Sequence, residues 1–329
     1  MINLTNKKPF LLITIDTEGD NLWSRPKYIT TENVNFLPRF QELCEFYSFQ
    51  PTYLVNYEMA CSEAFTEFGL DVISNKTAEI GMHLHAWNNP PNHKLTQDDY
   101  FYQPYLIEYP EYIINEKIKI VTDLLEDTFN QKMISHRSGR WSFNDRYANL
   151  LTHHGYKIDC SVTPLRSWRN TLGDPKGDGG TDFFLYPNKP YWIVGSKGNF
   201  RNALLEIPVT IISQNNFINY LINNPILPTK LIKNILRTYI KPIWFRPNGN
   251  NIDNMINILY YKLRAGHNYL MLTLHSSELM PDGSPVFKTE KDIEILYDHL
   301  NHIFTFAQKY FQSGTLTDYY NAFIKQAIK

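Results

Sequence analysis

The decapeptide LLITIDTEGD, residues 11–20, joins an apolar run to a charged turn. Its first five residues are nearly all apolar, which is typical of a strand that is covered on both faces. Successive side chains of an extended chain alternate between faces, so Asp16 and Glu18 share a face and Thr17 points elsewhere. An ordinary acidic turn would look the same in isolation. The stretch nevertheless predicts a core strand whose carboxyl end, the usual ligand-binding edge of α/β proteins, carries two carboxylates.

A second stretch, EIGMHLHAW at residues 79–87, repeats this arrangement with imidazoles. His83 and His85 follow Ile80 and Met82 at the end of another apolar run, and their spacing of two again places them on one face. Two strands that both end in chemically active side chains favour a functional site over two unrelated turns.

The composition indicates a globular protein with a sizeable core. The chain has 329 residues, of which 43% are hydrophobic and 20% are charged. A net charge of −1 gives no basic footprint for nucleic acid or an anionic membrane. The aromatic content of 15% includes 22 Tyr and 20 Phe. Such a surplus suits a groove that stacks flat, partly polar ligands as well as a core.

The cysteines and the N-terminus predict a soluble cytoplasmic protein. Cys44, Cys61 and Cys160 are odd in number and lack metal-type spacing, which favours reduced thiols. The apolar run before Asp16 has only about six residues, too few for a signal peptide. No run approaches the roughly 20 apolar residues of a membrane span.

Strands and helices alternate along the chain, which predicts parallel pairing with helices outside. Strands are expected over residues 11–15, 51–60, 79–87, 132–141, 156–162, 204–210 and 269–275. Helices are expected over residues 36–49, 61–75, 111–129, 251–265 and 288–311, and another between an Asn144 N-cap and a Gly155 stop. One α/β domain over residues 1–329, barrel-like with seven or eight parallel strands, explains this rhythm better than two domains.

Three long segments interrupt this alternation of strands and helices. Residues 88–110 form a loop with four prolines and several aromatic residues, and residues 164–203 suggest an extended excursion that could include a hairpin. Residues 211–250 look like apolar helical segments that prolines interrupt.

Functional groups end five of the expected strands. Any one of them has a structural alternative, such as a hydrogen-bonded core histidine, a loop-capping aspartate or a surface arginine. Because the C-terminal ends of parallel barrel strands converge on one mouth, their coincidence predicts a common site. The residues are Asp16, Glu18, His83, His85, Arg137, Asp159 and His275.

The order of these motifs resembles that of the polysaccharide deacetylases of carbohydrate esterase family 4, the NodB-homology proteins. The resemblance rests on TIDTEGD, EIGMHLHAW, HRSGRWSF, IDCS and LTLHSSE, which span about residues 10–280. It implies a deformed (β/α) barrel of about seven strands and metal-dependent removal of acetyl groups from amino sugars. The chain departs from the family pattern where Thr17 replaces a second Asp and where the Arg motif lacks its usual Pro and aromatic residue.

The resemblance also implies the metal ligands. Glu18 and His83 would bind a divalent ion, with Zn²⁺ expected. The family's second His lies four residues after the first, where this chain has Trp87. His85 shares a strand face with His83 and is the expected replacement, and His93 in the following loop is the reserve.

The remaining roles concern acid–base catalysis. The resemblance makes Asp16 the general base, Arg137 the group that keeps Asp16 ionised, and His275 the general acid for the leaving amine. Asp159 would orient a neighbour, for which His275 is the candidate. The chemistry is consistent, because a metal on two imidazoles and a carboxylate keeps positions open and lowers the pKa of water from 15.7 to near 7.

Four further residues are expected to bind substrate: Trp23, Trp87, Arg140 and Trp141. The tryptophans follow the motifs closely, and they either pack the barrel mouth or stack on sugar rings. Arg140 is otherwise a surface charge.

The sequence thus predicts a metal-dependent hydrolase acting on an N-acetylated sugar in surface-polysaccharide or sugar-precursor metabolism. One alternative is another C–N hydrolase on the same barrel, of the deformylase or cyclic amidase type. The other is a carbohydrate-binding protein without turnover, which would not need the base and acid pair. The oligomeric state is not predicted.

Overall fold

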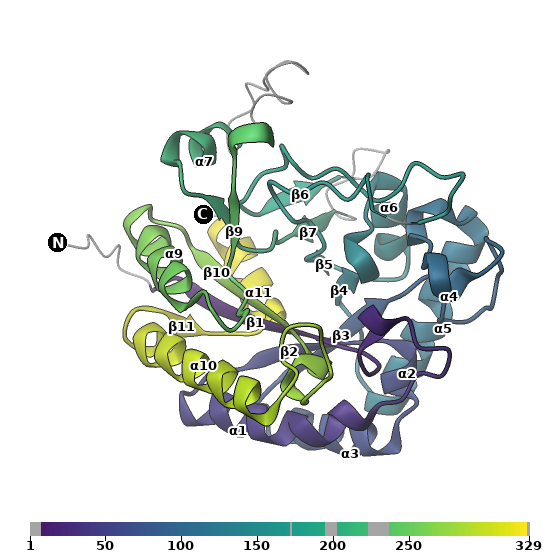
Figure 1. The fold of residues 1–329 in the computed structure, drawn as a ribbon, viewed down its shortest axis with the longest axis horizontal. Coiled ribbons are helices and arrows are strands. Elements are labelled where there is room, and N and C mark those ends of the chain that lie inside the picture. Colours follow the sequence, from purple (N-terminus) through teal and green to yellow (C-terminus); the bar gives the residue numbers. More distant parts are fainter. Residues whose placement is uncertain (1–7, 172, 195–202, 223–236, 328–329) are drawn as a thin grey trace.

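A curved sheet forms the centre of the computed structural model, which describes residues 8–171, 173–194, 203–222 and 237–327 (Figure 1). Its strands follow the order β10-β1-β2-β3-β4-β5-β7-β6, and β11 also pairs with β1. Within these residues, seven strands of the main path run parallel: β1 (Phe10–Thr17), β2 (Pro51–Val55), β3 (Glu79–Leu84), β4 (Ser135–Ser138), β5 (Ile158–Asp159), β7 (Leu204–Glu206) and β10 (Tyr269–His275). The predicted α/β class and deformed barrel of about seven parallel strands are confirmed.

The barrel is deformed because its two ends do not join through a strand ladder in the described part of the chain. Single hydrogen bonds cross this seam instead. The Tyr269 hydroxyl donates to the Pro208 carbonyl oxygen at 2.6 Å, and the Met271 N–H donates to Thr210 Oγ1 at 2.9 Å. Since proline has no N–H to donate, Pro208 cannot continue the ladder of β7.

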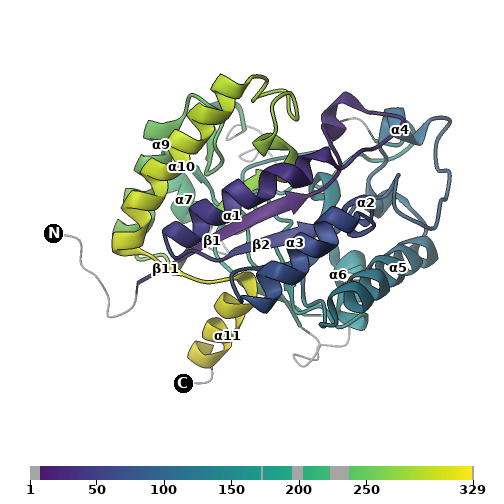
Figure 2. The same ribbon diagram turned by 90° about the horizontal axis from the view of Figure 1, so that it is seen from below.

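Helices cover the outside of the sheet. Figure 2 shows α1 and α3 crossing in front of β1 and β2, where their apolar stripes are buried. The longer helices are α1 (Leu37–Phe46), α3 (Glu63–Ser74), α5 (Glu111–Phe129), α6 (Asp145–His153), α9 (Ile252–Arg264), α10 (Glu290–Tyr310) and α11 (Leu316–Ala327). The first six of these confirm predicted helices.

The predicted start and end of α6 are confirmed by the residues that cap it. The side chain of Asn144 accepts a hydrogen bond from the Tyr147 N–H at 2.9 Å, which satisfies a donor in the first turn of the helix. Gly155 follows the helix with a φ of 95°, a backbone conformation that glycine adopts without a steric cost.

Several predicted strands are shorter in the structure. Residues 51–60 divide into β2 and α2 (Tyr57–Ala60), because Asn56 caps the helix by accepting from the Met59 N–H. β3 ends at Leu84, and β4, β5 and β7 occupy only part of residues 132–141, 156–162 and 204–210.

The interrupting segments also contain strands. β6 (Tyr191–Ile193), near the end of the excursion, pairs antiparallel with β7, the strand that follows the excursion. Residues 211–250 were predicted to be helical, but β8 (Ile211–Ser213) and β9 (Pro242–Trp244) form an antiparallel pair beside α7 (Asn216–Ile222). Residues 223–236 lie outside the described part. Residues 88–110 include α4 (Asp99–Tyr102).

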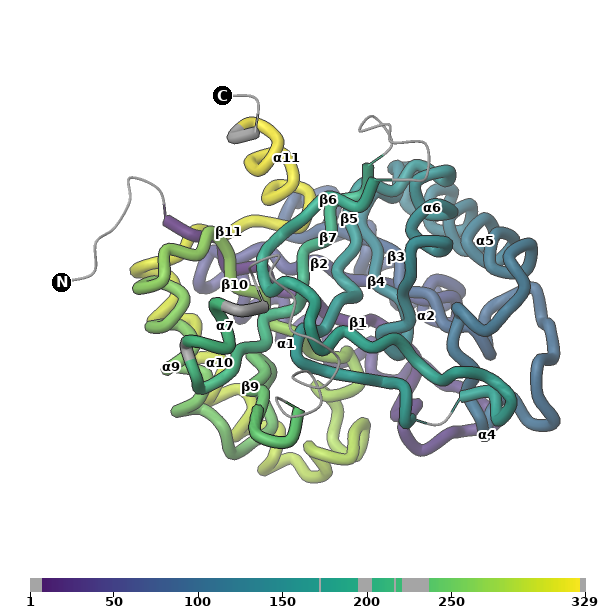
Figure 3. Tube along the Cα trace, turned by 90° about the horizontal axis from the view of Figure 1, so that it is seen from above, coloured from purple at the N-terminus to yellow at the C-terminus, as the bar shows by residue number. Residues whose placement is uncertain are grey.

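The C-terminal residues form two elements that the sequence pattern missed. β11 (Gln312–Ser313) pairs with the start of β1, and α11 follows it. Figure 3 shows α11 beside β6, where Trp192 contacts the rings of Tyr320 and Phe323. In the described ranges no helix has the length and apolarity needed to cross a membrane. The prediction of one domain over residues 1–329 stays a prediction.

Candidate active site

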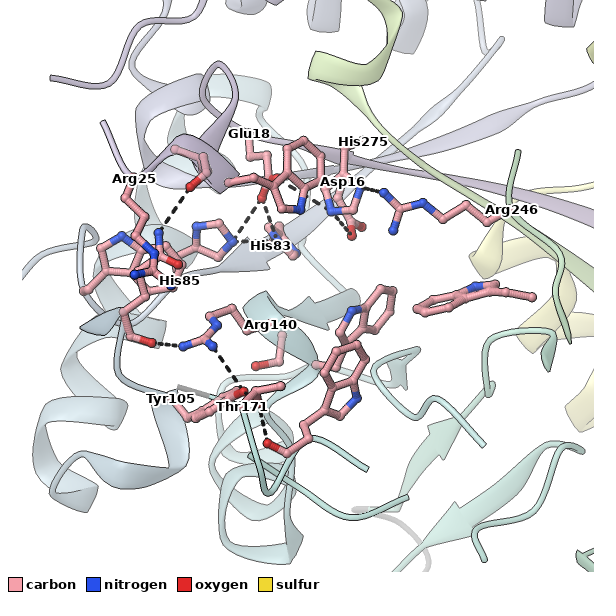
Figure 4. Close-up of a pocket in the computed structure, with 18 residues that line it drawn as sticks. Asp16, Glu18, Arg25, His83, His85, Tyr105, Arg140, Thr171, Arg246 and His275 are labelled. Atoms are coloured by element: carbon pink, nitrogen blue, oxygen red, sulfur yellow. Dashed lines mark hydrogen bonds and ion pairs between the residues drawn. The ribbon is translucent and has the colours of Figure 1, made fainter. Parts of the chain in front are cut away.

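Three potential metal donors meet where β1 and β3 end. Glu18 directly follows β1, His83 lies near the end of β3 and His85 directly follows it. The Nε2 atoms of the two histidines lie 3.0 Å apart. Oε2 of Glu18 lies 3.3 Å from the Nε2 atom of His83 and 3.0 Å from that of His85 (Figure 4). All three side chains are buried, and among the described residues they form the one such donor cluster.

This donor set fits a divalent metal ion. Zn²⁺ bonds to histidine nitrogen and carboxylate oxygen at about 2.0–2.2 Å in a tetrahedron, so its ligand atoms lie about 3.3 Å apart. The measured separations are close to this value. Nδ1 of His83 lies 3.0 Å from the Arg137 carbonyl oxygen, and donation there leaves the Nε2 lone pair facing the cluster.

The electrostatics of the cluster favour a cation. Burial opposes ionisation of Glu18, but His275 and His85 outweigh it and hold the pKa of Glu18 well below its usual value. Burial also lowers the pKa of His83, yet the negative charges of Asp16 and Glu18 raise it overall. A bound metal ion would supply the positive charge that these carboxylates stabilise.

The His85 ring fits beside Gly139 only because glycine has no side chain. A Cβ atom on Gly139 would lie 1.9 Å from Cδ2 of His85 and 2.8 Å from the Leu84 carbonyl oxygen. On its other side the His85 ring stacks on Trp87 at 4.5 Å and 19°. Trp87 therefore holds the His85 ring in place through packing.

Replacing Gly139 with Ala should weaken metal binding, because the added methyl group must displace the His85 ring or the backbone beside it. Zinc affinity, measured by competition with a chelating dye, should fall at least about tenfold if one ligand leaves its position, an effect of the size seen on losing an outer-shell partner. Circular dichroism would establish that the variant is folded. Full zinc affinity in a folded variant would contradict this account of the ring.

The pair of Asp16 and Arg137 lies beside the donor cluster. Oδ1 of Asp16 accepts a hydrogen bond from Nη1 of Arg137 at 2.6 Å. The arginine is fully buried and also donates to Thr14 Oγ1 at 2.8 Å and to the Cys160 carbonyl oxygen at 3.1 Å. Burial opposes ionisation of Asp16, but the Arg137 guanidinium outweighs it and keeps the pKa of Asp16 below its usual value. Asp16 is therefore ionised at neutral pH.

His275 faces the same carboxylates from the neighbouring strand. Asp16 and His275 are register partners on β1 and β10, and His275 Nε2 lies 3.6 Å from Oδ2 of Asp16 and 3.7 Å from Oε1 of Glu18. Nη2 of Arg246 lies 2.9 Å from Nδ1 of His275. Because arginine only donates, Nδ1 accepts, and the neutral ring carries its proton on Nε2.

Arg246 provides a hydrogen-bond donor beside the His275 ring, whereas Glu278 provides an acceptor. It accepts from the His275 backbone N–H at 2.9 Å, and the same oxygen lies 3.5 Å from Nδ1 of His275. Arg246 donates to the other Glu278 oxygen at 2.9 Å. Burial opposes ionisation of Glu278, but Arg246 and His275 lower its pKa to about 2. The ionised carboxylate can accept a hydrogen bond from Nδ1–H when the ring is charged.

The structure corrects the suggested partner of Asp159. Its Oδ1 lies 2.6 Å from Nδ1 of His136, and its Oδ2 accepts from the Ser161 N–H at 2.8 Å. These contacts orient His136, whereas Glu278 and Arg246 contact His275. Asp159 also faces Glu206 across β5 and β7, and burial together with this neighbouring carboxylate raises the pKa of Glu206 well above its usual value.

A cavity of about 330 Å³ opens in front of the cluster, within the usual size range of ligand pockets. Tryptophan dominates its walls, as five of the six tryptophans line it: Trp23, Trp87, Trp141, Trp168 and Trp244. Trp23 is 40% exposed and meets the His275 ring edge-on at 4.7 Å. Trp141 is buried and contacts Trp244 at 5.3 Å. Arg140 lines the side of the cavity that lies away from Asp16 and Glu18 (Figure 4).

His93, the reserve ligand, lies elsewhere. Its ring contacts Tyr109 and Tyr112 and lines a separate hollow, which shares Trp87 with the main cavity. The loop of residues 88–110 does not bring it to Glu18.

Replacing His85 with Ala should therefore abolish stoichiometric metal binding, whereas His93→Ala should keep it. A zinc site needs three protein ligands in the usual catalytic arrangement, and the first variant has only two. Metal analysis of both proteins after dialysis against the same zinc buffer compares them directly. Normal zinc in His85→Ala together with loss in His93→Ala would reverse the assignment.

The site predicted from the sequence lacked several residues that line the cavity, among them Arg25, Tyr105, Trp168, Thr171, Trp244 and Arg246, and it also lacked Glu278, which contacts His275. Glu278 had a signal, because it follows His275 by three residues in LTLHSSE. The others come from segments without periodic patterns, and nothing in their local sequence points to the site.

The fold and this cluster define the class of the protein, a deformed (β/α) barrel with a candidate metal centre at its mouth. No family model and no curated protein matches the sequence. A solved structure from Mycobacterium smegmatis, assigned as a polysaccharide deacetylase, aligns over 98% of this chain and 93% of its own, with a TM-score of 0.54 and 12% identity.

Two structures with other activities share this fold. An allantoinase aligns over 95% of this chain and 88% of its own, with a TM-score of 0.50 and 13% identity. The 4-α-glucanotransferase of Thermococcus litoralis aligns over 95% of this chain and 40% of its own, with a TM-score of 0.54 and 12% identity. The chain therefore has the fold of the polysaccharide deacetylase structure, as the sequence resemblance implied. A fold hosts several chemistries, so the activity must be argued from the site.

Proposed function

We propose that the protein is a metal-dependent hydrolase that removes an N-acetyl group from an amino sugar or saccharide. We place it in surface-polysaccharide or sugar-precursor metabolism in the cytoplasm. The observation that supports this most is the convergence of Glu18, His83 and His85 beside Asp16 and His275. Amide hydrolysis needs an activated water, a polarised carbonyl and a proton for the amine, and this arrangement offers a group for each.

Glu18, His83 and His85 would hold the ion, for which we propose Zn²⁺. Bound there, it would lower the pKa of a water molecule and polarise the acetyl carbonyl group. The tryptophan-lined cavity in front of the cluster suits a sugar ring, since aromatic faces pack against its apolar C–H surface.

Asp16 is the proposed general base. Arg137 occupies Oδ1, so Oδ2 is the oxygen that faces His275 and is placed to accept a proton from the attacking water. As the water oxygen bonds to the acetyl carbon, its proton moves to Oδ2. The ion pair with Arg137 fixes the orientation of the carboxylate, which is where a general base gains its efficiency.

His275 is the proposed general acid. As the C–N bond breaks, the amine nitrogen takes the Nε2 proton of the charged His275 ring, which leaves a neutral ring with its proton on Nδ1, beside Glu278. Acetate and the free amino sugar are released. Arg246 and Glu278 are positioning residues that contact the far side of the ring. Arg246 can donate to Nδ1 of a neutral ring protonated on Nε2, and Glu278 can accept from the Nδ1–H of the charged ring and of the neutral ring that proton donation leaves.

Hydrolysis of a formyl group or a cyclic amide is the second candidate. The shared fold of an allantoinase favours keeping it, although the likeness concerns the fold alone. The same base and acid would serve that reaction. The non-catalytic alternative gives no reason for an ionised Asp16 to face His275.

Chelation tests the proposal. After exhaustive dialysis against a chelator, the protein should release no acetate from N-acetylglucosamine oligomers, and adding Zn²⁺ should restore release. Circular dichroism before and after dialysis would show that the loss does not reflect unfolding. Acetate release that survives removal of all metal would contradict metal dependence. If the zinc-restored protein releases no acetate but hydrolyses a formylated or cyclic amide, the second candidate would be favoured.

A further inference from the structure

The two histidines of the donor cluster are held by different means. His83 lies within β3 and pairs with β4, but this ladder ends at the pair of Leu84 and Ser138, one residue before His85. The His85 N–H donates instead to Oδ1 of Asn89 at 2.7 Å, and the Asn89 side chain is buried. The register of the sheet therefore positions His83, whereas a side chain from the following turn positions the backbone of His85.

The His85 ring also lacks the second hydrogen bond that usually orients a metal-binding histidine. Nδ1 of His83 has a backbone carbonyl oxygen at 3.0 Å. Nδ1 of His85 is buried and has no hydrogen-bond partner among the described residues. Packing against Gly139 and Trp87 limits the ring on two sides. The position of the Nε2 atom of His85 therefore depends strongly on its backbone, and so on Asn89.

A buried lysine holds the turn that carries Asn89. Lys117 lies on α5, and its Nζ atom donates to the carbonyl oxygen of Asn89 and, at 2.8 Å, to that of Pro91. The same atom lies 5.5 Å from the centre of the Tyr109 ring. Burial lowers the pKa of Lys117 to about 8, so the charged form still predominates at pH 7.

Lysine is costly at this position. Its neighbours on the inner face of α5 include Ile113, Ile114 and Val121, which are buried with it. An ammonium group loses its hydration there, and lysine is almost never fully buried unless it is paired. An apolar side chain would avoid this cost. What the ammonium group adds is a pair of hydrogen bonds to the backbone of residues 89–91.

We propose that Lys117 and Asn89 are positioning residues for the metal site. Lys117 fixes the backbone of residues 89–91, and Asn89 in turn fixes the backbone of His85, so that the ring meets Glu18 and His83. The inference rests on the proposed function for the metal. It explains how His85, which lies beyond the end of β3, can share a site with a histidine within that strand.

Zinc affinity tests the inference independently of turnover. Lys117→Met keeps an aliphatic chain of similar length without the ammonium donors, and Asn89→Ala removes the acceptor for the His85 N–H. Each should weaken zinc binding, measured by competition with a chelating dye, by about tenfold or more, the usual effect of losing an outer-shell partner. Loss of the Lys117 charge would by itself strengthen binding of a cation, so weaker binding must come from the lost hydrogen bonds.

Lys262→Met is the matched control. Lys262 is also buried, but it lies on α9, and its Nζ atom is 5.2 Å from the centre of the Tyr269 ring on β10. This variant should keep its zinc affinity. The double variant Lys117→Met/Asn89→Ala should bind zinc no more weakly than the weaker single variant, because both changes act through the same hydrogen bond to His85.

Two measurements separate positioning from a role in stability alone. Urea unfolding of the metal-free proteins gives the stability of each variant, and the visible absorption of bound Co²⁺ reports the arrangement of its ligands. The Co²⁺ spectrum should change in Lys117→Met and in Asn89→Ala, and it should stay the same in Lys262→Met. Asn89→Ala leaves the core of α5 intact, so it remains informative if Lys117→Met does not fold.

Unchanged zinc affinity and an unchanged Co²⁺ spectrum in either folded variant would overturn the inference, even if that variant is less stable. So would additive losses in the double variant. If the unmodified protein shows zinc-dependent acetate release, both of these results leave the proposed function standing. Weaker zinc binding in both single variants, without acetate release by the unmodified protein, would support the inference and contradict the proposed deacetylation.

Discussion

Replacing Asp16 with Asn is expected to lower acetate release by about 10²–10⁴-fold while metal content stays normal, because that range is the usual contribution of a positioned general base. The asparagine side chain keeps an oxygen that can accept from Arg137, and the three donor atoms of the cluster are untouched. The amide cannot take a proton from water at neutral pH. Steady-state rates and zinc content would be measured on the same preparation.

The matched control is Asp253→Asn, which removes a carboxylate from an exposed position in the first turn of α9. It should keep a rate close to that of the unmodified protein. Loss of zinc in Asp16→Asn would contradict the assignment, since Asp16 would then be a ligand and its role would exchange with that of Glu18.

Replacing Arg137 with Met should destabilise the protein by about 3–5 kcal/mol, because the change leaves the buried Asp16 carboxylate without its partner. It also removes the donors to Thr14 and to the Cys160 carbonyl oxygen. Urea unfolding at pH 7 would give the free energy of unfolding. Arg39→Met is the control, because its ion pair with Glu294 is exposed and such pairs contribute little.

The double variant Asp16→Asn/Arg137→Met separates charge from packing. If the uncompensated carboxylate causes most of the loss, adding Asp16→Asn to Arg137→Met should recover part of the free energy of unfolding, and the two changes should be non-additive. Additive losses would show instead that Arg137 stabilises the core mainly through its packing and its other hydrogen bonds.

The fold could be predicted because its signals are periodic and local. β1 and β10 are apolar along nearly their whole length, as strands covered on both faces must be, and the helices between strands show their apolar stripes. The errors concern where elements stop. Asn56 begins a helix through one side-chain hydrogen bond, and Pro208 interrupts a ladder because it lacks an N–H, and periodicity does not report such single-residue events. The β8–β9 pair joins segments about 30 residues apart, so no local pattern reveals it.

In the candidate site too, the residues on regular strands could be predicted and those on irregular segments could not. Asp16, His83, Arg137 and His275 lie on parallel strands, where the register alone brings their side chains to one edge. Arg246 and Tyr105 reach the cavity from irregular segments, whose paths depend on tertiary contacts that the sequence does not display. The partner of Asp159 was mistaken for a related reason, because His136 is its register neighbour and was not recognised as a candidate.

The pairing of β1 with β10 also determines when the protein can become active during its synthesis. The hydrogen bond between Glu18 and Ser276 joins residues 258 positions apart. At about 5–20 residues per second, the ribosome needs on the order of 10–50 s to make that interval. Throughout this time the apolar edge of β1 lacks its partner strand and is a potential site for aggregation or chaperone binding. Nascent chains that stop before β10 would carry the metal donors but lack the proposed acid, so the capacity to bind metal would precede the capacity to turn over.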